Sequence, residues 1–208
     1  MALIFLTGAA AACEGQVGKV VFEDNFADDS GGWGLAKNYV ELKNNTLVMR
    51  PNLGAKDNSS LMFSWVPAFS VSDGDYCAEF ILPPAPAADN NVAAGMIFWL
   101  KDNNNIHSFT IVTNKSVGLY RLIDGKWSTL YTEQNNASVK TEKNSVNSLR
   151  IVAKEGKLTL FINGVLFKAI RAQMPEGVSH FGFWMQVDKS TDADTRVVFK
   201  NFKVTSGQ

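Results

Sequence analysis

The chain has 208 residues and no net charge, because 20 lysine and arginine residues balance 20 aspartate and glutamate residues. Hydrophobic residues make up 46% of it and charged residues 19%, which is typical of a soluble globular protein. No basic cluster is present, which argues against nucleic acid or an anionic membrane surface as partner and favours a neutral ligand.

The first segment, Met1 to Ala12, is a short apolar run followed by small residues, the pattern of a secretory signal segment. No lysine or arginine precedes the run, and a buried N-terminal strand is the alternative. The segment is too short to span a membrane, and no other segment has the length of a spanning helix. We therefore predict a signal segment and N-terminal lead over residues 1–18, a single domain over residues 19–208, and a secreted, periplasmic or cell-surface protein.

Two cysteines, Cys13 and Cys77, leave three interpretations open. Cys13 follows small residues and can be the lipidated first residue of a bacterial lipoprotein, although Ala10 stands where a leucine is usual. Alternatively, the two cysteines form one disulfide in an oxidising compartment, or both are inert thiols.

Short β-rich runs separated by Gly, Asn, Asp and Pro clusters follow along the rest of the chain, and helical periodicity is almost absent. The predicted strands are Val20–Asp24, Tyr39–Leu42, Thr46–Arg50, Leu61–Val66, Asp75–Leu82, Gly95–Lys101, Ile106–Val112, Gly118–Ile123, Trp127–Thr132, Val146–Ala153, Leu158–Ile162, Val165–Arg171, Phe181–Val187 and Arg196–Val204. Strands at this density predict an all-β protein in which two antiparallel sheets form a jelly-roll sandwich.

Tight turns separate several of these strands. Asp124-Gly125 and Asn163-Gly164 suit the type I′ hairpin turn, whose central residues need positive φ. Glu155-Gly156 is predicted to form a third turn. Asn163 is therefore expected to be a turn residue and not a ligand.

Two strands each carry a tryptophan on the side opposite to their apolar residues. Trp99 in Gly95–Lys101 and Trp184 in Phe181–Val187 alternate with phenylalanine, methionine and leucine residues. Successive strand side chains point to opposite faces, so each strand is predicted to have a core face and a face that combines an aromatic ring with polar groups. Such a face suits stacking against the apolar side of a sugar ring.

Aromatic residues and hairpin signals also recur in a spaced order from Val20 onward. The segments are Phe22–Phe26 with Trp33, Gly95–Trp99 with Asp102 and Asn105, Gly118–Leu122 with Gly125–Trp127, Leu160–Gly164, and Val198–Phe202. This order resembles the concanavalin A-like lectin/glucanase jelly rolls, and within them the laminin-G-like modules and the domain of bacterial 3-keto-glycoside hydrolases. The resemblance implies a concave sheet face on which glycans bind.

Strand parity extends the candidate binding face to the neighbours of the two tryptophans, with Tyr120 and Leu122 assigned to the core. The candidate face comprises Trp99, Trp184, Arg121, Glu79, Ser108, Thr110 and Gln186, with Asn103 in a polar loop at its rim. The alternative is that both tryptophans belong to a satellite core under a loop. Trp33, Trp65 and Trp127 are predicted to be structural.

Glycoside hydrolysis needs two carboxyl groups roughly 5 to 9 Å apart. Glucanases of the resembled superfamily carry a Glu-x-Asp-x-x-Glu strand motif, which is absent here, and Asp75 and Glu79 would lie roughly 13 Å apart along a strand. Elimination chemistry on a 3-keto-glycoside can use one carboxylate, an arginine and either a histidine or a metal ion, and the candidate residues are Glu79, Arg121 and His107. We predict carbohydrate binding without turnover, with a glycoside hydrolase and a protein-interaction module as alternatives.

Jelly rolls of the resembled type often hold a structural calcium ion, which prefers oxygen ligands. Glu23, Asp24, Asp192 and Asp194 are the candidate ligands, near chain ends that pair in this fold. Lys200, however, stands where relatives often carry an aspartate.

Overall fold

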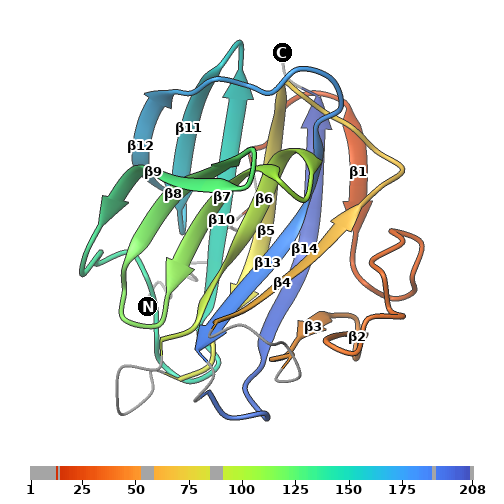
Figure 1. Ribbon diagram of the computed structural model, residues 1–208, viewed down its shortest axis with the longest axis vertical. Helices are drawn as coiled ribbons and strands as arrows, with labels where there is room; N and C mark the ends of the chain where they lie inside the picture. Colours follow the sequence, from red (N-terminus) through yellow and green to blue (C-terminus); the bar gives the residue numbers. More distant parts are fainter. Residues whose placement is uncertain (1–12, 14, 53–58, 85–90, 189–190, 207–208) are drawn as a thin grey trace, which may run out of the picture.

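The computed structural model describes residues 13, 15–52, 59–84, 91–188 and 191–206, which contain fourteen β-strands and no helix (Figure 1). The strands are β1 (Val20–Asp24), β2 (Val40–Leu42), β3 (Leu47–Met49), β4 (Ser59–Val66), β5 (Gly74–Ile81), β6 (Ala93–Asp102), β7 (Asn105–Val112), β8 (Val117–Ile123), β9 (Lys126–Glu133), β10 (Val146–Lys154), β11 (Lys157–Ile162), β12 (Val165–Arg171), β13 (His180–Asp188) and β14 (Val197–Ser206). Every predicted strand is present, and no strand end differs from its prediction by more than two residues.

The strands form two antiparallel sheets, which confirms the predicted jelly-roll sandwich. The eight-stranded sheet has the order β12-β11-β10-β5-β14-β3-β2, with β1 paired to β14. The six-stranded sheet has the order β4-β13-β6-β7-β8-β9. Half of the strand pairings join strands that are not consecutive in the chain, and the chain crosses repeatedly between the two sheets.

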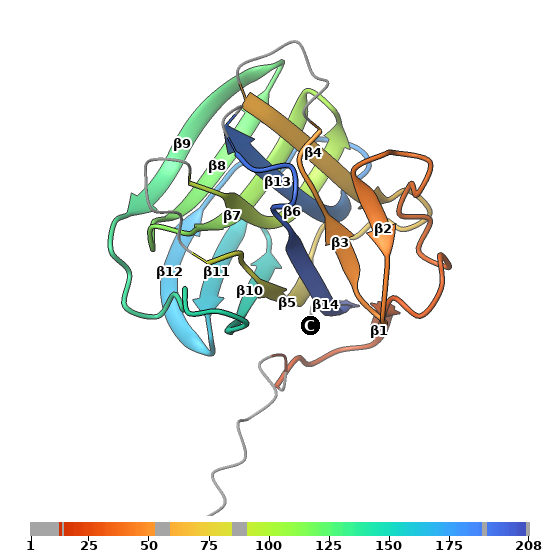
Figure 2. The same cartoon turned by 90° about the horizontal axis from the view of Figure 1, so that it is seen from below.

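The two sheets lie face to face (Figure 2), and the core between them is rich in aromatic side chains. The ring of Phe183 in β13 stacks on Phe199 of β14, with centroids 4.4 Å apart, and on Trp33, with centroids 5.3 Å apart. Trp33 is fully buried, and its indole Nε1 donates a hydrogen bond of 2.8 Å to Asp24. Burial of these rings is the main force that holds the two sheets together.

The hairpin turns have the backbone geometry that the sequence predicted. Asp124 and Gly125 have φ values of 49° and 74°, and Asn163 and Gly164 have 51° and 79°. The side chain of Asn163 also ties the turn to a neighbouring loop, because its Nδ2 donates a hydrogen bond of 2.6 Å to the carbonyl of Ser138. Asn163 therefore has a structural role, as predicted.

Cys13 and Cys77 form a disulfide, with Cα atoms 5.6 Å apart. The structure therefore agrees with the disulfide interpretation, one of the three that the sequence left open. The bond joins the segment before β1 to β5, in the middle of the eight-stranded sheet. The proposed signal segment, residues 1–12, lies outside the described part of the chain.

The described part of the chain contains no helix that is long and hydrophobic enough to span a membrane.

Candidate functional site

The outer face of the six-stranded sheet carries the candidate site, and β13 shows how its two faces differ. Phe181, Phe183 and Met185 point into the core, whereas Trp184 and Gln186 point to the outer face. This is the alternation that the sequence predicted for β13. The face assignment of Trp184 is therefore confirmed.

A groove of about 470 Å³ lies over this face. It is lined by Leu61 of β4, Ala93 of β6, Thr110 and Val112 of β7, Tyr120 of β8, Trp127, Ser128 and Thr129 of β9, and Trp184 and Gln186 of β13. The lining combines aromatic rings, hydroxyl groups and one amide, and none of these residues carries a charge. Such a lining suits a ligand with apolar faces and hydroxyl edges.

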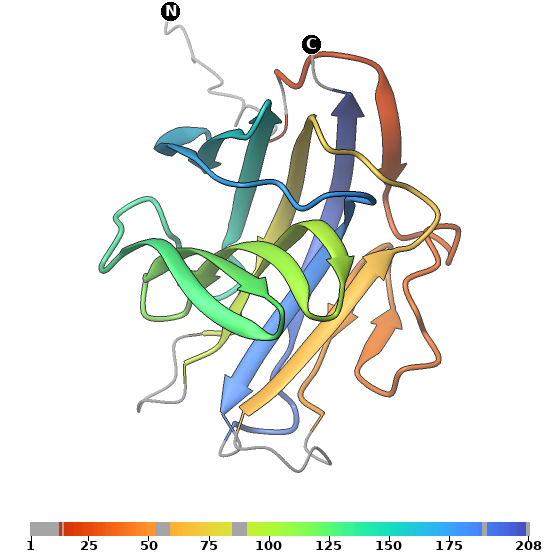
Figure 3. The same cartoon turned by 45° about the horizontal axis from the view of Figure 1, so that its top comes forward.

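Two tryptophans at opposite sides of the sheet stack inside the groove. Trp184 lies on the second strand and Trp127 on the sixth, yet their ring centroids are 6.1 Å apart with an interplanar angle of 26°. Four strand spacings span roughly 19 Å in a flat sheet, so the sheet curls around its outer face. Figure 3 shows this curvature in the green strands β6 to β9.

The two stacked indoles differ in exposure. Trp127 is 44% exposed, whereas Trp184 is 4% exposed beneath it. Phe63 of β4 also stacks with Trp184, at a centroid distance of 6.5 Å. Trp184 thus belongs to a separate buried cluster on this face, which is the alternative that the sequence left open for it, and Trp127 is the more exposed ring of the pair.

Polar groups form hydrogen bonds at the base of the groove. The indole Nε1 of Trp184 donates a hydrogen bond of 3.1 Å to the hydroxyl of Thr110, which is itself buried. Tyr120 is partly buried, and this burial raises the pKa of its phenol. The phenol therefore stays protonated at neutral pH and keeps a hydrogen-bond donor beside the groove.

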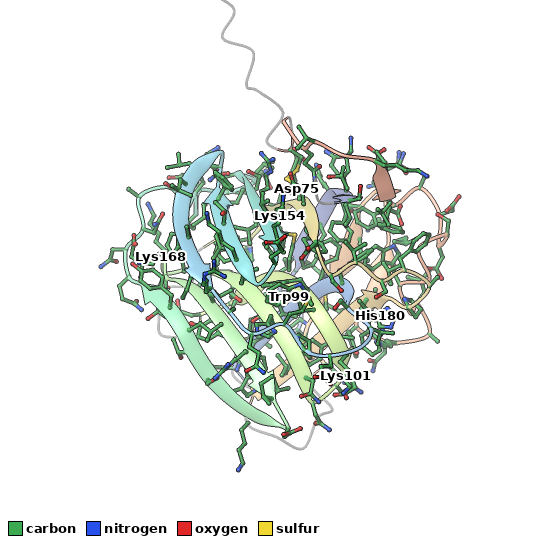
Figure 4. The ribbon with its side chains drawn as sticks, turned by 90° about the horizontal axis from the view of Figure 1, so that it is seen from above. Asp75, Trp99, Lys101, Lys154, Lys168 and His180 are labelled. Carbon is green, nitrogen blue, oxygen red and sulfur yellow. A yellow bond between two sulfur atoms is a disulfide. The ribbon has the colours of Figure 1, made fainter. Side chains whose placement is uncertain are left out.

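The prediction that Trp99 lies on the outer face is wrong. Its side chain is fully buried between the two sheets (Figure 4). Its indole Nε1 donates a hydrogen bond of 2.7 Å to the carbonyl of Ser72. A β-bulge interrupts the pairing of β6 with β7 after Phe98, and Trp99 has a φ of 48°. The bulge reverses the alternation, so Leu100 takes the outer face in place of Trp99.

The face assignment of β8 is also wrong. Tyr120 and Leu122, predicted for the core, are on the outer face, and the buried Leu119 packs in the main core. Arg121 therefore points to the opposite side from Tyr120. Trp127, which was predicted to be structural, pairs with Leu122 and therefore lies on the same outer face, where it lines the groove.

Glu79 does not belong to this face at all. It lies on β5, in the eight-stranded sheet, where Asn201 donates a hydrogen bond of 2.8 Å to its carboxylate. The prediction assumed that β5 and β6 share a sheet, but β5 pairs with β10 and β14. The proposed set of Glu79, Arg121 and His107 is therefore divided between two sheets and cannot act on one substrate atom.

His107 is a core residue and not an exposed base. Its ring is fully buried on the core side of β7, with ring centroids 5.2 Å from Trp99 and 5.7 Å from Phe98. Neither ring nitrogen has a hydrogen-bond partner. Burial, and secondarily the charge of Arg121, lowers the pKa of His107 to about 4.

The remaining predicted residues are divided between the groove and other positions. Thr110 and Gln186 line the groove. Ser108 shares the outer face by its pairing with Tyr120, but its hydroxyl is buried and has no partner. Asn103 is exposed in the turn between β6 and β7, and it is not among the residues that line the groove.

The predicted calcium ligands do not gather into one site. Among the described residues, no three His, Cys, Asp or Glu side chains lie close enough together to hold a metal ion. The Asp24 carboxylate already accepts hydrogen bonds from the backbone of Phe26, at 2.6 Å, and from Trp33. Asp192 accepts one from the backbone N–H of Asp194. The four predicted ligands, Glu23, Asp24, Asp192 and Asp194, therefore do not form a common calcium site in this arrangement.

Comparison with known proteins identifies the fold. No family model matches the chain, and no curated protein matches its sequence. The carbohydrate binding module CBM66 from Bacillus subtilis matches with a TM-score of 0.54 at 18% identity, over 77% of this chain and 86% of the module. The laminarinase catalytic domain from Thermotoga maritima gives a TM-score of 0.64 at 11% identity, over 91% of this chain and 98% of the domain.

The Emp46p carbohydrate recognition domain also matches, with a TM-score of 0.56 at 11% identity, over 81% of this chain and 86% of that domain. At such low identities the likeness shows the fold alone. All three are concanavalin A-like jelly rolls. The chain therefore has the concanavalin A-like jelly-roll fold, as its spaced aromatic and hairpin pattern implied.

Proposed function

We propose that this protein is an exported carbohydrate-binding jelly roll that holds uncharged sugar rings in the groove of its six-stranded sheet without cleaving them. The observation that carries the proposal is the exposed indole of Trp127, stacked on the buried indole of Trp184 in a groove that has hydroxyl and amide groups in its walls. An aromatic platform supplies apolar contact area with little loss of conformational freedom, and nearby polar groups orient sugar hydroxyls.

The structural likeness supports a carbohydrate ligand. Two of the similar structures are a carbohydrate binding module and a carbohydrate recognition domain, and a third is a laminarinase catalytic domain. The fold alone does not define the activity, because this architecture supports both binding and hydrolysis. The chemistry of the groove has to distinguish them.

The groove lining favours binding over hydrolysis. The residues that line it in the described part of the chain include no aspartate and no glutamate. Glycoside hydrolysis usually needs a pair of carboxyl groups on either side of the scissile bond. With Glu79 on the other sheet and His107 in the core, the elimination chemistry proposed for a 3-keto-glycoside has no support in the arrangement of side chains either.

Export is supported by two features. Residues 1–12 have the pattern of a signal segment, and the disulfide between Cys13 and Cys77 is of a kind that persists in oxidising compartments.

A glycan array followed by calorimetry tests the proposal. Wild-type protein is expected to bind at least one glycan, and Trp127→Ala is expected to weaken that binding at least about tenfold, because the exposed stacking surface is lost. Trp127→Phe should retain most of the affinity. Leu166→Ala is the matched control, because Leu166 is 58% exposed on β12 of the other sheet.

Two outcomes contradict the proposal. One is the absence of binding to every glycan on the array. The other is a bound glycan whose affinity does not change in Trp127→Ala. Release of reducing sugar from the bound glycan would overturn the non-catalytic part of the proposal and leave the binding site in place.

A further inference from the structure

A second hollow, of about 510 Å³, lies beside the groove. It is lined by Lys101, Asn105, Arg121, Ile123, Asp124, Lys126, Trp127, Ser128, Gln173, Met174, Pro175 and Glu176. Trp127 and Ser128 line both hollows, although Arg121 points to the opposite face of the sheet from the groove residue Tyr120, so the two hollows meet around the edge strand β9. A ligand that stacks on Trp127 can therefore reach the second hollow by passing around the edge of the sheet at β9.

The second hollow is charged, in contrast to the groove. Its lining carries three cations, Lys101, Arg121 and Lys126, against two anions, Asp124 and Glu176. None of the three cations has a described carboxylate oxygen within 4.0 Å. The cations are thus available to a negatively charged ligand group, although the protein as a whole has no net charge.

Arg121 is the cation best placed to select a ligand. It is partly buried, and its Nε donates a hydrogen bond of 3.0 Å to the hydroxyl of Ser128, which orients the guanidinium group. The residue that pairs with Arg121 on β7 is His107, which carries no negative charge that could neutralise the guanidinium group. The free edge of a guanidinium matches two oxygens of a carboxylate or sulfate group, and an oriented arginine loses little freedom on binding them.

We propose that the glycan held on Trp127 carries an anionic substituent, a sugar carboxylate or a sulfate ester, that Arg121 binds in the second hollow with the help of Lys101 and Lys126. This inference rests on the proposed glycan-binding function and adds to it the chemical class of the ligand. The uncharged groove binds the sugar rings, and the cations of the second hollow bind the negatively charged substituent.

Matched pairs of polysaccharides test this inference. One pair is polygalacturonate and its fully methyl-esterified form, and the other is a carrageenan and its desulfated form. Members of a pair differ only in whether the charge is present, and the two pairs distinguish a carboxylate from a sulfate ester. Wild-type protein should bind the charged member of one pair at least about tenfold more tightly than the neutral member, and added salt should reduce the difference.

Variants then assign the effect to Arg121. Arg121→Gln should remove the preference for the charged member of the pair. Arg121→Lys should restore only part of the preference, because the ammonium group keeps the charge and loses the planar geometry. Lys43→Gln is the control for net charge, since Lys43 is exposed at the turn between β2 and β3 in the other sheet.

The outcomes separate this inference from the proposed function. If the protein binds only neutral glycans, or binds charged glycans equally well in Arg121→Gln, the inference is overturned and the glycan-binding function stands. If no glycan binds at all, the proposed function fails and the inference fails with it. Thermal melts of each variant confirm that the comparison is made on folded protein.

Discussion

The hydroxyl of Thr110 on β7 accepts a hydrogen bond of 3.1 Å from the indole Nε1 of Trp184 on β13, across the intervening strand β6. The residue between them is Gly95, which pairs with both. A Cβ atom on Gly95 would meet the carbonyl oxygen of Phe109 and lie 2.8 Å from the Cα of Thr110, so the strands approach here closely enough to need glycine. This contact holds the buried indole beneath Trp127.

Replacing Thr110 by valine should test that role. Thr110→Val preserves the shape of the side chain and leaves the buried indole N–H of Trp184 without a partner, so we expect the free energy of unfolding to fall by about 1–3 kcal/mol. Urea denaturation followed by tryptophan fluorescence measures the change. Thr129→Val, at an exposed position of the same groove, should leave stability almost unaltered, and equal losses in the two variants would disprove the role of the hydrogen bond.

Trp99 and Trp127 should respond in opposite ways to truncation. Trp99→Ala removes a fully buried indole and its hydrogen bond to Ser72, so we expect a loss of about 3–5 kcal/mol of stability and no loss of glycan affinity in the folded fraction. Trp127→Ala should change stability by about 1 kcal/mol or less and weaken glycan binding. Trp99→Phe gives the same comparison if Trp99→Ala does not fold.

Stability should depend on pH through His107. Burial lowers the pKa of its folded form from 6.5 to about 4, so between these values the unfolded chain binds the extra proton and the folded protein does not. The contribution of neutral His107 to stability is therefore complete above about pH 6.5 and is lost as the pH falls towards 4, by roughly 3 kcal/mol in total.

His107→Gln isolates this effect, because glutamine does not titrate. The difference in urea midpoint between wild type and His107→Gln should change steadily between pH 6.5 and pH 4, with wild type losing more stability. A constant difference over that range would show that His107 is not buried in its neutral form.

The disulfide should stabilise the fold without affecting the groove. It closes a loop with a sequence separation of 64 residues, so Cys13→Ala/Cys77→Ala should lower the free energy of unfolding by about 2–4 kcal/mol. Glycan affinity should stay unchanged, because Cys77 lies on β5 of the other sheet. Reductant should lower the melting temperature of wild type alone; free thiols in unreduced, unfolded wild type would contradict the disulfide.

Local sequence patterns were sufficient to predict the strands and turns of this protein. The alternation of Phe183 and Met185 with Trp184 predicted the two faces of β13 correctly, because a regular strand places alternate side chains on opposite sides. Asp124-Gly125 and Asn163-Gly164 predicted hairpins because the type I′ turn needs residues that tolerate positive φ. These features depend on neighbouring residues in the chain.

The composition of the candidate site was decided by the tertiary structure. Trp99 does not lie on the predicted face because a β-bulge reverses the alternation of β6. Glu79 does not lie there because β5 pairs with β10 and β14 in the other sheet. The signal for Trp127 was present in the hairpin at Asp124-Gly125, which sets its pairing with Leu122, but the face of β8 was unknown. Bulges, strand pairing and sheet curvature arise from hydrogen bonds and packing between segments that are distant in the chain. Alternation within one strand therefore shows which side chains share a face, but not which sheet the strand joins or which of its faces meets the core.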